Sequence, residues 1–257
     1  MSQSESNRPI ASVLSTFRVL EEVAQRQPVG VSEIARGTGM PKSTVQRCLL
    51  TLHHAGWLRM VDPDRAKWGV TTKPLGIGLR AAGEEGLREA AAPYLDELRD
   101  LTDETVHLTA RDGDQLIVLS RRDSTQAVRT HVDIGAVAPM HATSSGLAVL
   151  AHLPDEEVHR ILDGGLERFT PETIVAKRDL LEEIRRTRER GFAVNTRSWW
   201  RPDVSAVAAA VLASSGRPIA AIAISIPSMR FDPERIGFYG TCATDIAQKI
   251  SKALESF

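Results

Sequence analysis

The chain has 257 residues, of which 42% are hydrophobic and 25% charged, and its formal net charge is −1. These values are typical of a globular protein with one large domain or two smaller ones. Two cysteines that lie far apart in the sequence argue against a disulfide scaffold and a CxxC metal site. We recognise no signal peptide and no apolar run long enough to cross a bilayer, so we expect a cytoplasmic protein.

The near-neutral total hides a difference between two parts of the chain. Residues 1–80 contain 11 Lys or Arg and 6 Asp or Glu, a net charge of +5. Residues 81–257 contain 21 and 27, a net charge of −6. A positive N-terminal part favours contact with phosphates, and an acidic remainder favours a separate role.

The first expected helix begins at Ile10 and ends before Pro28 and Gly30. Its apolar residues recur with helical spacing, which predicts one buried stripe. The stripe consists of Ile10, Val13, Leu14, Phe17, Leu20 and Ala24.

A second, shorter helix follows, with Ser32 as its expected N-cap. Glu33 beside it suits the positive end of the helix dipole. Gly37 and Gly39 can adopt the positive φ angles that a tight turn between two helices needs. We therefore expect a helix-turn-helix here.

A third helix opens at Pro41, and its inward face is formed by Val45, Cys48, Leu49 and Leu52. A tight turn presents the N-terminus of such a helix to the DNA major groove, where Ser, Gln and Arg can address base edges and Lys and Thr can contact phosphates. The candidate DNA contacts are Ser32, Lys42, Ser43, Thr44, Gln46 and Arg47. The alternative is an ordinary solvated helix face, but the preceding helix, the glycine turn and the strands that follow favour DNA binding.

Two short strands, residues 57–61 and 66–70, flank the turn sequence Asp62-Pro63-Asp64-Arg65 and form the expected wing. Arg59, Arg65 and Lys67 are candidates for contact with the DNA backbone or an adjacent minor groove. The alternative is that these charges are merely solvated.

Further along, residues 139–146 (PMHATSSG) precede an apolar helix, and Gly191-Phe192-Ala193 opens a strand. With the winged helix-turn-helix and a helical linker, these segments resemble the IclR family of bacterial transcriptional regulators over nearly the whole chain. The resemblance implies a DNA-binding domain at residues 8–72, a linker helix at 73–86 and a GAF-like effector-binding and oligomerisation domain at 87–257. It also implies a homodimer or homotetramer that binds double-stranded DNA and a small-molecule effector.

The linker sequence, residues 74–86, is a glycine-punctuated helix start, and a longer amphipathic helix follows. Pro93 inside that helix should kink it or begin a new segment. Its apolar stripe is formed by Leu87, Ala91, Tyr94, Leu95, Leu98 and Leu101. This stripe is a natural place for subunits to meet, and packing within its own domain is the alternative.

The rest of the chain alternates between strand and helix patterns, which predicts an α+β domain. We expect strands at residues 105–110, 115–120, 127–132, 192–196, 204–212 and 218–226, and helices at 144–152, 155–162, 177–190 and 232–254. In the last two strands bulky residues alternate with Ala and Ser, so one sheet face is lined by small side chains. That face has room for a ligand or for a closely packed helix, and the resemblance favours a ligand pocket in an antiparallel GAF-like fold.

The resemblance implies where the effector binds. Ser144 and Ser145 open a helix whose N-terminus suits an anionic oxygen. The other implied contacts are Ala127, Thr130, Ala138, Asn195, Val204, Ala206, Ala223 and Ser225. The loop at residues 195–201 (NTRSWWR) departs from the family, which usually has acidic residues after the Gly-aromatic strand entry. Its arginines and tryptophans suggest an anionic ligand, an organic or aromatic acid; burial of the tryptophans is the alternative.

Seven histidines raise the question of catalysis. No HExxH motif, nucleophile elbow or phosphate loop is present. Ser144 or Ser145 with His141 as nucleophile and base, and a zinc site formed by His131, His141 and a carboxylate, remain weak alternatives. We expect no enzyme activity, no cofactor and no metal. A further alternative is that the C-terminal domain only oligomerises, without sensing a ligand.

Overall fold

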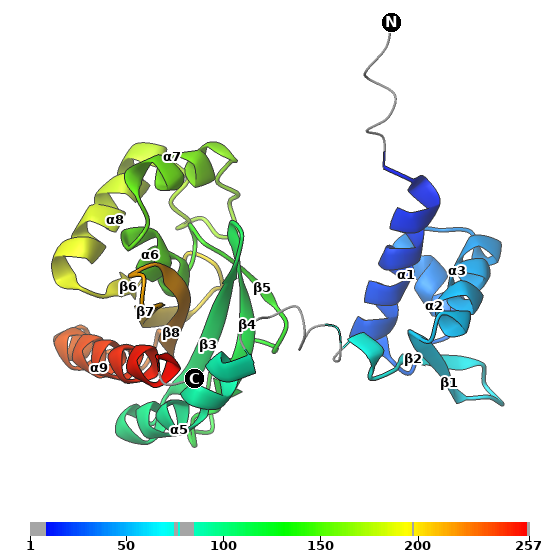
Figure 1. The fold of residues 1–257 in the computed structure, drawn as a ribbon, viewed down its shortest axis with the longest axis horizontal. Coiled ribbons are helices and arrows are strands. Elements are labelled where there is room, and N and C mark those ends of the chain that lie inside the picture. Colours follow the sequence, from blue (N-terminus) through cyan, green and yellow to red (C-terminus); the bar gives the residue numbers. More distant parts are fainter. Residues whose placement is uncertain (1–8, 75–76, 78–84, 197, 256–257) are drawn as a thin grey trace, which may run out of the picture. The chain divides into compact units, whose positions relative to one another are not determined.

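The computed structural model of the chain describes residues 9–74, 77, 85–196 and 198–255 (Figure 1). The chain divides into two compact units, Met1–Gly83 and Glu84–Phe257. The expected linker helix at 73–86 falls mostly on residues 75–76 and 78–84, which lie outside the described residues, as does Arg197. The domain limits 8–72, 73–86 and 87–257 therefore stay predictions.

Between residues 9 and 70, the N-terminal unit consists of three helices followed by a two-stranded antiparallel hairpin. These elements are α1 (Ala11–Arg26), α2 (Val31–Thr38), α3 (Lys42–His54), β1 (Leu58–Asp62) and β2 (Lys67–Val70). Val19 and Val23 of α1, Ile34 of α2, Leu49 of α3 and Trp68 of β2 are buried in one hydrophobic cluster. The winged helix-turn-helix that the sequence predicts is thereby confirmed.

The buried stripe predicted for α1 is wrong. The exposed apolar residues at the start of this helix are Ile10, Val13, Leu14 and Phe17, and Phe17 is 51% exposed. The buried residues of α1 are Val19 and Val23. The first turns of α1 extend past α2 and α3 (Figure 1), so neither of these helices covers them. Periodicity finds the apolar face of a helix, but it does not show which part of that face is covered.

The turn between α2 and α3 uses only one of its two glycines for a positive φ. Gly39 caps α2 with a φ of 71°, whereas Gly37 lies within the helix. A Cβ on Gly37 would lie 1.8 Å from Oε1 of Glu22 in α1. A side chain at residue 37 would therefore displace the carboxylate of Glu22, and the turn itself does not require Gly37.

The start of α2 also differs from the prediction, because the N-cap is Gly30 and not Ser32. The carboxylate of Glu33 accepts a hydrogen bond from the Gly30 N–H at 2.9 Å, which satisfies one of the free donors at this helix end. Ser32 is an exposed residue of the first helical turn. The Glu at the third helical position, together with a permissive glycine, places the cap two residues earlier than expected.

The C-terminal unit is built on a six-stranded antiparallel sheet in the order β5-β4-β3-β8-β7-β6. Its strands are β3 (Thr105–Asp112), β4 (Gln115–Arg122), β5 (Val137–Pro139), β6 (Ala193–Asn195), β7 (Val204–Leu212) and β8 (Pro218–Pro227). In the central pair, His107 lies opposite Ala223 and Thr105 lies opposite Ser225. These four side chains therefore share one face of the sheet.

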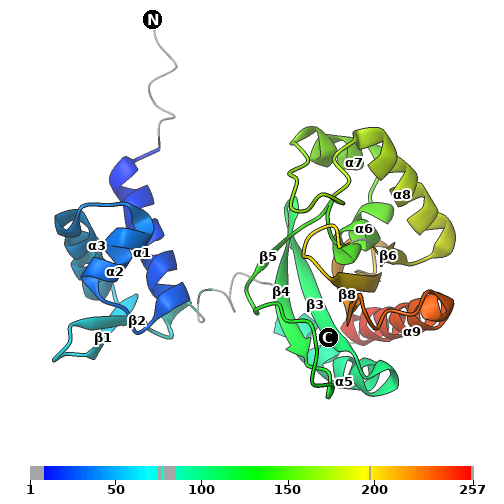
Figure 2. The ribbon, with the colours of Figure 1, turned by 180° about the vertical axis from the view of Figure 1, so that it is seen from behind.

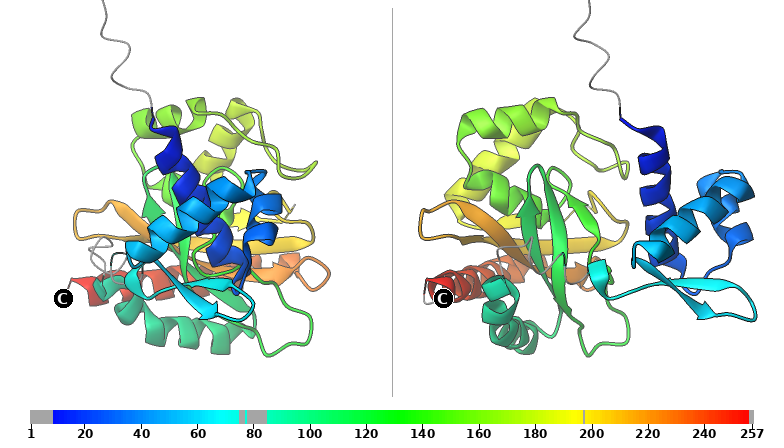
Figure 3. Two further views of the ribbon diagram at one scale, coloured as in Figure 1. Left: turned by 90° about the vertical axis from the view of Figure 1, so that its right-hand side faces the viewer. Right: turned by 45° about the vertical axis from the view of Figure 1, so that its right-hand side comes forward.

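Helices cover both faces of this sheet (Figures 2 and 3). One face packs against α5 (Glu85–Thr102) and α9 (Ile236–Leu254), and a 3₁₀ turn (Pro233–Arg235) precedes α9. The other face packs against α6 (Ser144–Ala151), with α7 (Asp155–Asp163) and α8 (Lys177–Arg190) beyond it. The predicted α+β architecture is confirmed. Among the described residues, no helix combines the length and apolar character that crossing a membrane requires.

The two sheet faces differ in side-chain size, as the alternation in β7 and β8 predicts. Ile222 and Ile224 lie in the hydrophobic cluster with α5 and α9. Ala208 and Ala221 lie in the cluster with α6, where their small size lets the helix approach. Further along the same face Ala223 lines a pocket. The sequence left close helix packing and a ligand pocket as alternatives for the face lined by small side chains, and both occur on it.

The third strand is not at residues 127–132 but at Val137–Pro139. Residues 123–136 follow an irregular path. The carboxylate of Asp103 accepts hydrogen bonds from the backbone N–H and the hydroxyl of Thr125 and from the side chain of Gln126. Thr125 and Gln126, which lead into the expected strand, therefore bond to Asp103 and not to a neighbouring strand.

Pro93 does not begin a new segment, because α5 runs through it. Pro93 is exposed, so the carbonyl that loses its helical hydrogen bond can be hydrated. The predicted stripe of α5 is largely buried in its own domain, with Leu95 and Leu98 fully buried, whereas Leu101 is exposed. Most of this stripe is therefore core and not a free surface for a partner.

Candidate functional site

The outward face of α3 presents the side chains that are candidates for DNA contact. Lys42, Ser43 and Arg47 are exposed, and Thr44 and Gln46 are half-buried at the edges of the face. Within the described part of the chain, no hydrogen bond or ion pair occupies the side chain of Lys42 or Arg47. Both positive charges are therefore available at the surface for phosphates or base edges.

The hairpin places its three cations differently. Arg59 and Arg65 are exposed. Lys67 instead forms an ion pair with Glu33, the residue whose carboxylate also binds the N–H of Gly30. The hydrogen bond from Lys67 and then that from Gly30 hold the pKa of Glu33 below its ordinary value. Lys67 thus ties the wing to α2, a role that the sequence does not predict, and its contact with DNA stays a prediction.

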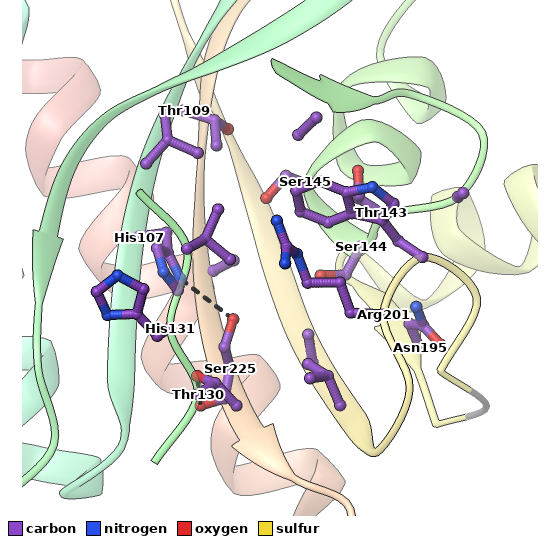
Figure 4. A pocket seen from close by; sticks show the side chains of 18 residues that line it. His107, Thr109, Thr130, His131, Thr143, Ser144, Ser145, Asn195, Arg201 and Ser225 are labelled. Carbon is purple, nitrogen blue, oxygen red and sulfur yellow. Dashed lines mark hydrogen bonds between the residues drawn. The ribbon is translucent and has the colours of Figure 1, made fainter. Parts of the chain in front are cut away.

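A pocket opens in the C-terminal unit over the small-residue face of the sheet (Figure 4). Its interior has a cavity volume of about 70 Å³. Residues of β3, β7 and β8 form the floor, and the walls come from β4, β5, β6, the start of α6 and two loops at residues 130–132 and 200–201.

The start of α6 forms one wall of this pocket. Thr143 is the N-cap, and its hydroxyl oxygen accepts a hydrogen bond from the Gly146 N–H at 3.0 Å while the hydroxyl donates to the Pro139 carbonyl at 2.8 Å. The Leu147 N–H bonds to the carbonyl of Thr143. The N–H groups of Ser144 and Ser145 are the ones in this first turn that have no intrahelical acceptor. Both residues line the pocket, so an anionic group there meets two donors and the positive end of the helix dipole.

The loop at residues 198–203 adds a positive charge and an aromatic ring. The guanidinium of Arg201 lies over the ring of Trp200, 4.5 Å from its centroid, and both residues line the pocket. Trp199 is instead buried in the cluster with α6, so burial and pocket lining, which were alternatives for this pair, each apply to one tryptophan. None of the described residues that line the pocket is Asp or Glu.

His131, Asp133 and Arg121 form a hydrogen-bonded cluster at the rim of the pocket. His131 lines the pocket, and its Nε2 lies 2.9 Å from Asp133 Oδ1 and 3.1 Å from Nη1 of Arg121. The hydrogen bond to His131 lowers the pKa of Asp133. His131 is more than half exposed and sits among charges that compensate one another.

His107 on β3 is one of the pocket residues that the sequence did not nominate, together with Thr109, Val118, Val132, Ala142 and Thr143. It is only 4% exposed, and its Nδ1 lies 3.2 Å from the hydroxyl oxygen of Ser225. Burial lowers the pKa of His107 to about 4, so the imidazole is neutral at pH 7. A signal was present, because Thr105, His107 and Thr109 alternate with Val106 and Leu108 in a strand that is buried on both faces.

The pocket brings together nine of the ten residues that the sequence nominates for the effector. These nine are Thr130, Ala138, Ser144, Ser145, Asn195, Val204, Ala206, Ala223 and Ser225. Ala127 is the exception, since it is exposed in the irregular segment before Thr130 and does not line the pocket. Ala127 was nominated on the expectation of a strand that does not form.

The weak catalytic and metal alternatives find no support in the geometry. In the parts of the chain that the structure describes, no group of three or more His, Cys, Asp or Glu side chains could hold a metal ion. Nε2 of His141 lies 2.8 Å from the carbonyl oxygen of Glu167, so that ring is tied to the 167 loop. His53 is similarly tied, with its Nδ1 2.9 Å from the carbonyl oxygen of Leu58.

Comparison with known families gives two matches that together span most of the chain. Residues 12–62 match the IclR helix-turn-helix domain, and residues 80–252 match the family described as bacterial transcriptional regulator IclR, C-terminal. Among curated relatives, the HTH-type transcriptional regulator KdgR of Escherichia coli is 31% identical over 243 residues, which cover 94% of this chain and 92% of KdgR.

Solved structures show the same fold. A transcriptional regulator from Rhodococcus sp. RHA1 has a TM-score of 0.78 and 27% identity, and the match covers 96% of this chain and 99% of that one. An IclR homolog of Microbacterium hydrocarbonoxydans, solved in complex with 4-hydroxybenzoate, has a TM-score of 0.80 and 22% identity over 96% of this chain and all of that one.

Proposed function

The chain belongs to the IclR family of bacterial transcriptional regulators, and we propose that a small organic acid in its C-terminal pocket controls how tightly its winged helix-turn-helix binds DNA. A regulator of this family binds DNA through the helix-turn-helix and an effector through the C-terminal domain. The named relatives regulate transcription, so we propose no catalytic role and no cofactor. Because it acts on the chromosome, we expect it in the cytoplasm.

The observation that carries the proposal for an acid is the charge of the pocket. Arg201 contributes a full positive charge, the first turn of α6 contributes the N–H groups of Ser144 and Ser145, and no carboxylate opposes them among the described lining residues. A ligand carboxylate is stabilised by such an arrangement, whereas a cation is repelled. The ring of Trp200 offers a stacking surface for an aromatic body. The complex of the Microbacterium hydrocarbonoxydans homolog with 4-hydroxybenzoate, an aromatic acid, agrees with this chemistry.

For the DNA-binding half, we propose that α3 lies in the major groove. Arg47, in the middle of its exposed face, would read base edges, and Lys42 at its N-terminus would neutralise phosphate. Arg59 and Arg65 in the hairpin would contact the backbone beside the groove. Proteins with this motif generally bind repeated half-sites as dimers, so we propose that two copies bind together.

Regulation requires that the effector bind one arrangement of the protein better than another. An acid with equal affinity for the DNA-bound and DNA-free arrangements would change nothing. The proposal therefore predicts a measurable coupling between pocket occupancy and DNA affinity, in addition to binding at each site.

A thermal-shift screen of small acids tests the pocket. A saturating effector, at about 100 times its Kd, stabilises the folded domain by about 2.7 kcal/mol. For a domain of this size that corresponds to a rise in Tm of roughly 5–10 °C. Benzoate, phenylacetate and butyrate are suitable probes, each compared with its uncharged amide.

Arg201→Ala should abolish the preference for acid over amide. Arg178→Ala is the matched control, because Arg178 is an exposed arginine of α8 that does not line the pocket. If acids and amides shift wild type equally, or if Arg201→Ala responds to acids as wild type does, the proposal for an anionic effector in this pocket is wrong.

A further inference from the structure

The side chain of His107 on the pocket floor is not needed for binding a carboxylate. His107 stands on β3 among the small side chains of the sheet, with Ala223 directly opposite it on β8. The side chain is almost wholly buried, yet it lines the pocket. An imidazole in the place of another Ala or Ser reduces the volume available to a ligand and puts a polar ring at the deep end.

The orientation of this imidazole is fixed on one side only. Its Nδ1 lies 3.2 Å from the Ser225 hydroxyl, and the strand that carries Ser225 is held in turn by the Thr130 hydroxyl, which donates to the Ser225 carbonyl at 3.2 Å. The other ring nitrogen, Nε2, is buried and has no hydrogen-bond partner among the described residues. Buried polar atoms normally have a partner, and leaving one unpaired is costly.

The surroundings disfavour a positive charge on His107 or on the partner of Nε2. Burial, and then the charge of Arg121, lower the pKa of His107, with smaller contributions from His131 and Arg201 and an opposing one from Asp123. These groups make a cation at this place unfavourable. The neutral ring also offers no charge to a carboxylate, which finds the first turn of α6 and Arg201 instead.

The two polar ends of the pocket lie on different walls. Figure 4 shows His107 and Ser225 on the strands, with Ser144 and Ser145 on α6 across from them. A ligand held by its carboxylate at α6 therefore directs its other end toward the sheet floor.

We propose that the effector is a hydroxy acid, with its carboxylate at the start of α6 and its hydroxyl hydrogen-bonded to Nε2 of His107. This inference rests on the proposed function, because it takes the carboxylate site as given. A hydroxyl fits either tautomer of the ring. If Ser225 donates to Nδ1, then Nε2 carries the hydrogen and donates to the ligand oxygen; if Nδ1 donates to Ser225, then Nε2 accepts the ligand hydrogen. His107 is thus a specificity-determining residue that selects hydroxylated acids over plain ones.

Matched pairs of ligands test this directly. The probes are 4-hydroxybenzoate with benzoate, 4-hydroxyphenylacetate with phenylacetate, and 3-hydroxybutyrate with butyrate, titrated by calorimetry into full-length protein. In wild type, one hydroxylated member should bind about tenfold more tightly than its plain partner, the value of one net hydrogen bond to a buried group.

His107→Leu should remove that preference and leave the affinity for the plain acid the same or higher. His107→Gln, which keeps an amide in the pocket, provides a second variant if leucine disturbs the fold, and it should keep part of the preference. His159→Leu is the matched control, because His159 is an exposed histidine of α7 outside the pocket. It should behave as wild type in every titration.

The number of protons bound with the ligand provides an independent readout. Phosphate and Tris have different enthalpies of ionisation, so the difference between the binding heats measured in the two buffers at pH 7 gives the number of protons exchanged on binding. We expect the same proton number for wild type and His107→Leu, since the ring stays neutral in the complex.

Three results would overturn the inference. The first is a hydroxyl preference that is equal in wild type and both His107 variants. The second is that His107→Leu loses affinity equally for hydroxylated and plain acids while wild type takes up a proton on binding. This result would place the ligand carboxylate at His107. The third is no binding of any acid to wild type; it would overturn the proposed acid effector as well, whereas the first two leave that proposal standing.

Discussion

Gly146 in the first turn of α6 is the position where a single methyl group should disturb the pocket most. A Cβ at residue 146 would lie 2.0 Å from the carbonyl oxygen and 2.3 Å from the Cα of Met140, both of them backbone atoms. Real Cβ atoms essentially never approach other atoms closer than 3.0 Å, so Gly146→Ala requires the start of α6 or the segment before it to move by about 1 Å. No side chain can rotate away to relieve this overlap.

The size of the effect follows from two opposing contributions. Overpacking against a rigid neighbour costs about 1–3 kcal/mol, and contact with backbone argues for the upper end. Alanine gains about 1 kcal/mol over glycine inside a helix. We therefore expect Gly146→Ala to lower the free energy of unfolding of the C-terminal unit by about 2 kcal/mol, or its Tm by roughly 4–8 °C. The same movement displaces the N–H groups of Ser144 and Ser145, so affinity for acids should fall as well.

Gly237 provides the matched control for this substitution. It is also a helical glycine, at the start of α9, but a Cβ there would meet no atom within 4 Å. Gly237→Ala should raise the free energy of unfolding by about 0.4–1 kcal/mol. Differential scanning calorimetry of wild type and both variants measures these changes. A Gly146→Ala protein with the Tm of wild type and unaltered ligand affinity would refute the reasoning about α6.

Three other predictions concern DNA contact, pH and assembly. Lys42→Ala should weaken binding to every duplex alike and reduce by about one the slope of log affinity against log salt concentration. Arg47→Ala should cost about 1–3 kcal/mol of binding free energy and relax the base preference. Fluorescence anisotropy at several salt concentrations measures both effects, and an unchanged slope would remove Lys42 from the phosphate contacts. The pKa of His107 is lowered to about 4, below the unfolded value of 6.5, so its unfolded form takes up a proton as the pH falls through this range. Wild type should therefore lose about 2 kcal/mol more stability than His107→Leu between pH 7 and pH 5, and parallel denaturation curves would contradict this. Phe17→Asp, on the exposed apolar start of α1, should change the unfolding free energy by less than about 0.5 kcal/mol but weaken self-association. Light scattering measures the mass of the assembly, and a mass equal to that of wild type would exclude this surface from the assembly.

Local patterns in the sequence predicted most elements of the fold. The face of α3 was correct because Val45, Cys48, Leu49 and Leu52 pack against neighbours that run along the whole helix. The stripe of α1 failed because periodicity does not show where a neighbouring element ends. The strand expected at 127–132 does not form, and Asp103, more than 20 residues earlier, binds Thr125 and Gln126 directly before it.

The pocket was predicted mainly through resemblance, and the physical patterns account for only part of it. Alternation in β7 and β8 showed a small-residue face, but the residue that shapes its deep end, His107, comes from β3 and meets β8 only through a pairing distant in sequence. The pairing of Lys67 with Glu33 was likewise invisible, since 34 residues separate the two. Contacts of this kind depend on how elements are assembled in space, about which a local pattern carries no information.

The central claim is that occupancy of the C-terminal pocket changes the affinity for DNA. The most direct measurement is the Kd of the full-length protein for a duplex selected from a random pool, at fixed salt, with and without the acid that gives the largest thermal shift. Coupling between two sites is typically worth about 1–3 kcal/mol, so wild type should change its Kd at least about fivefold, and Arg201→Ala should not respond. An identical Kd in the presence and absence of saturating acid would contradict the claim.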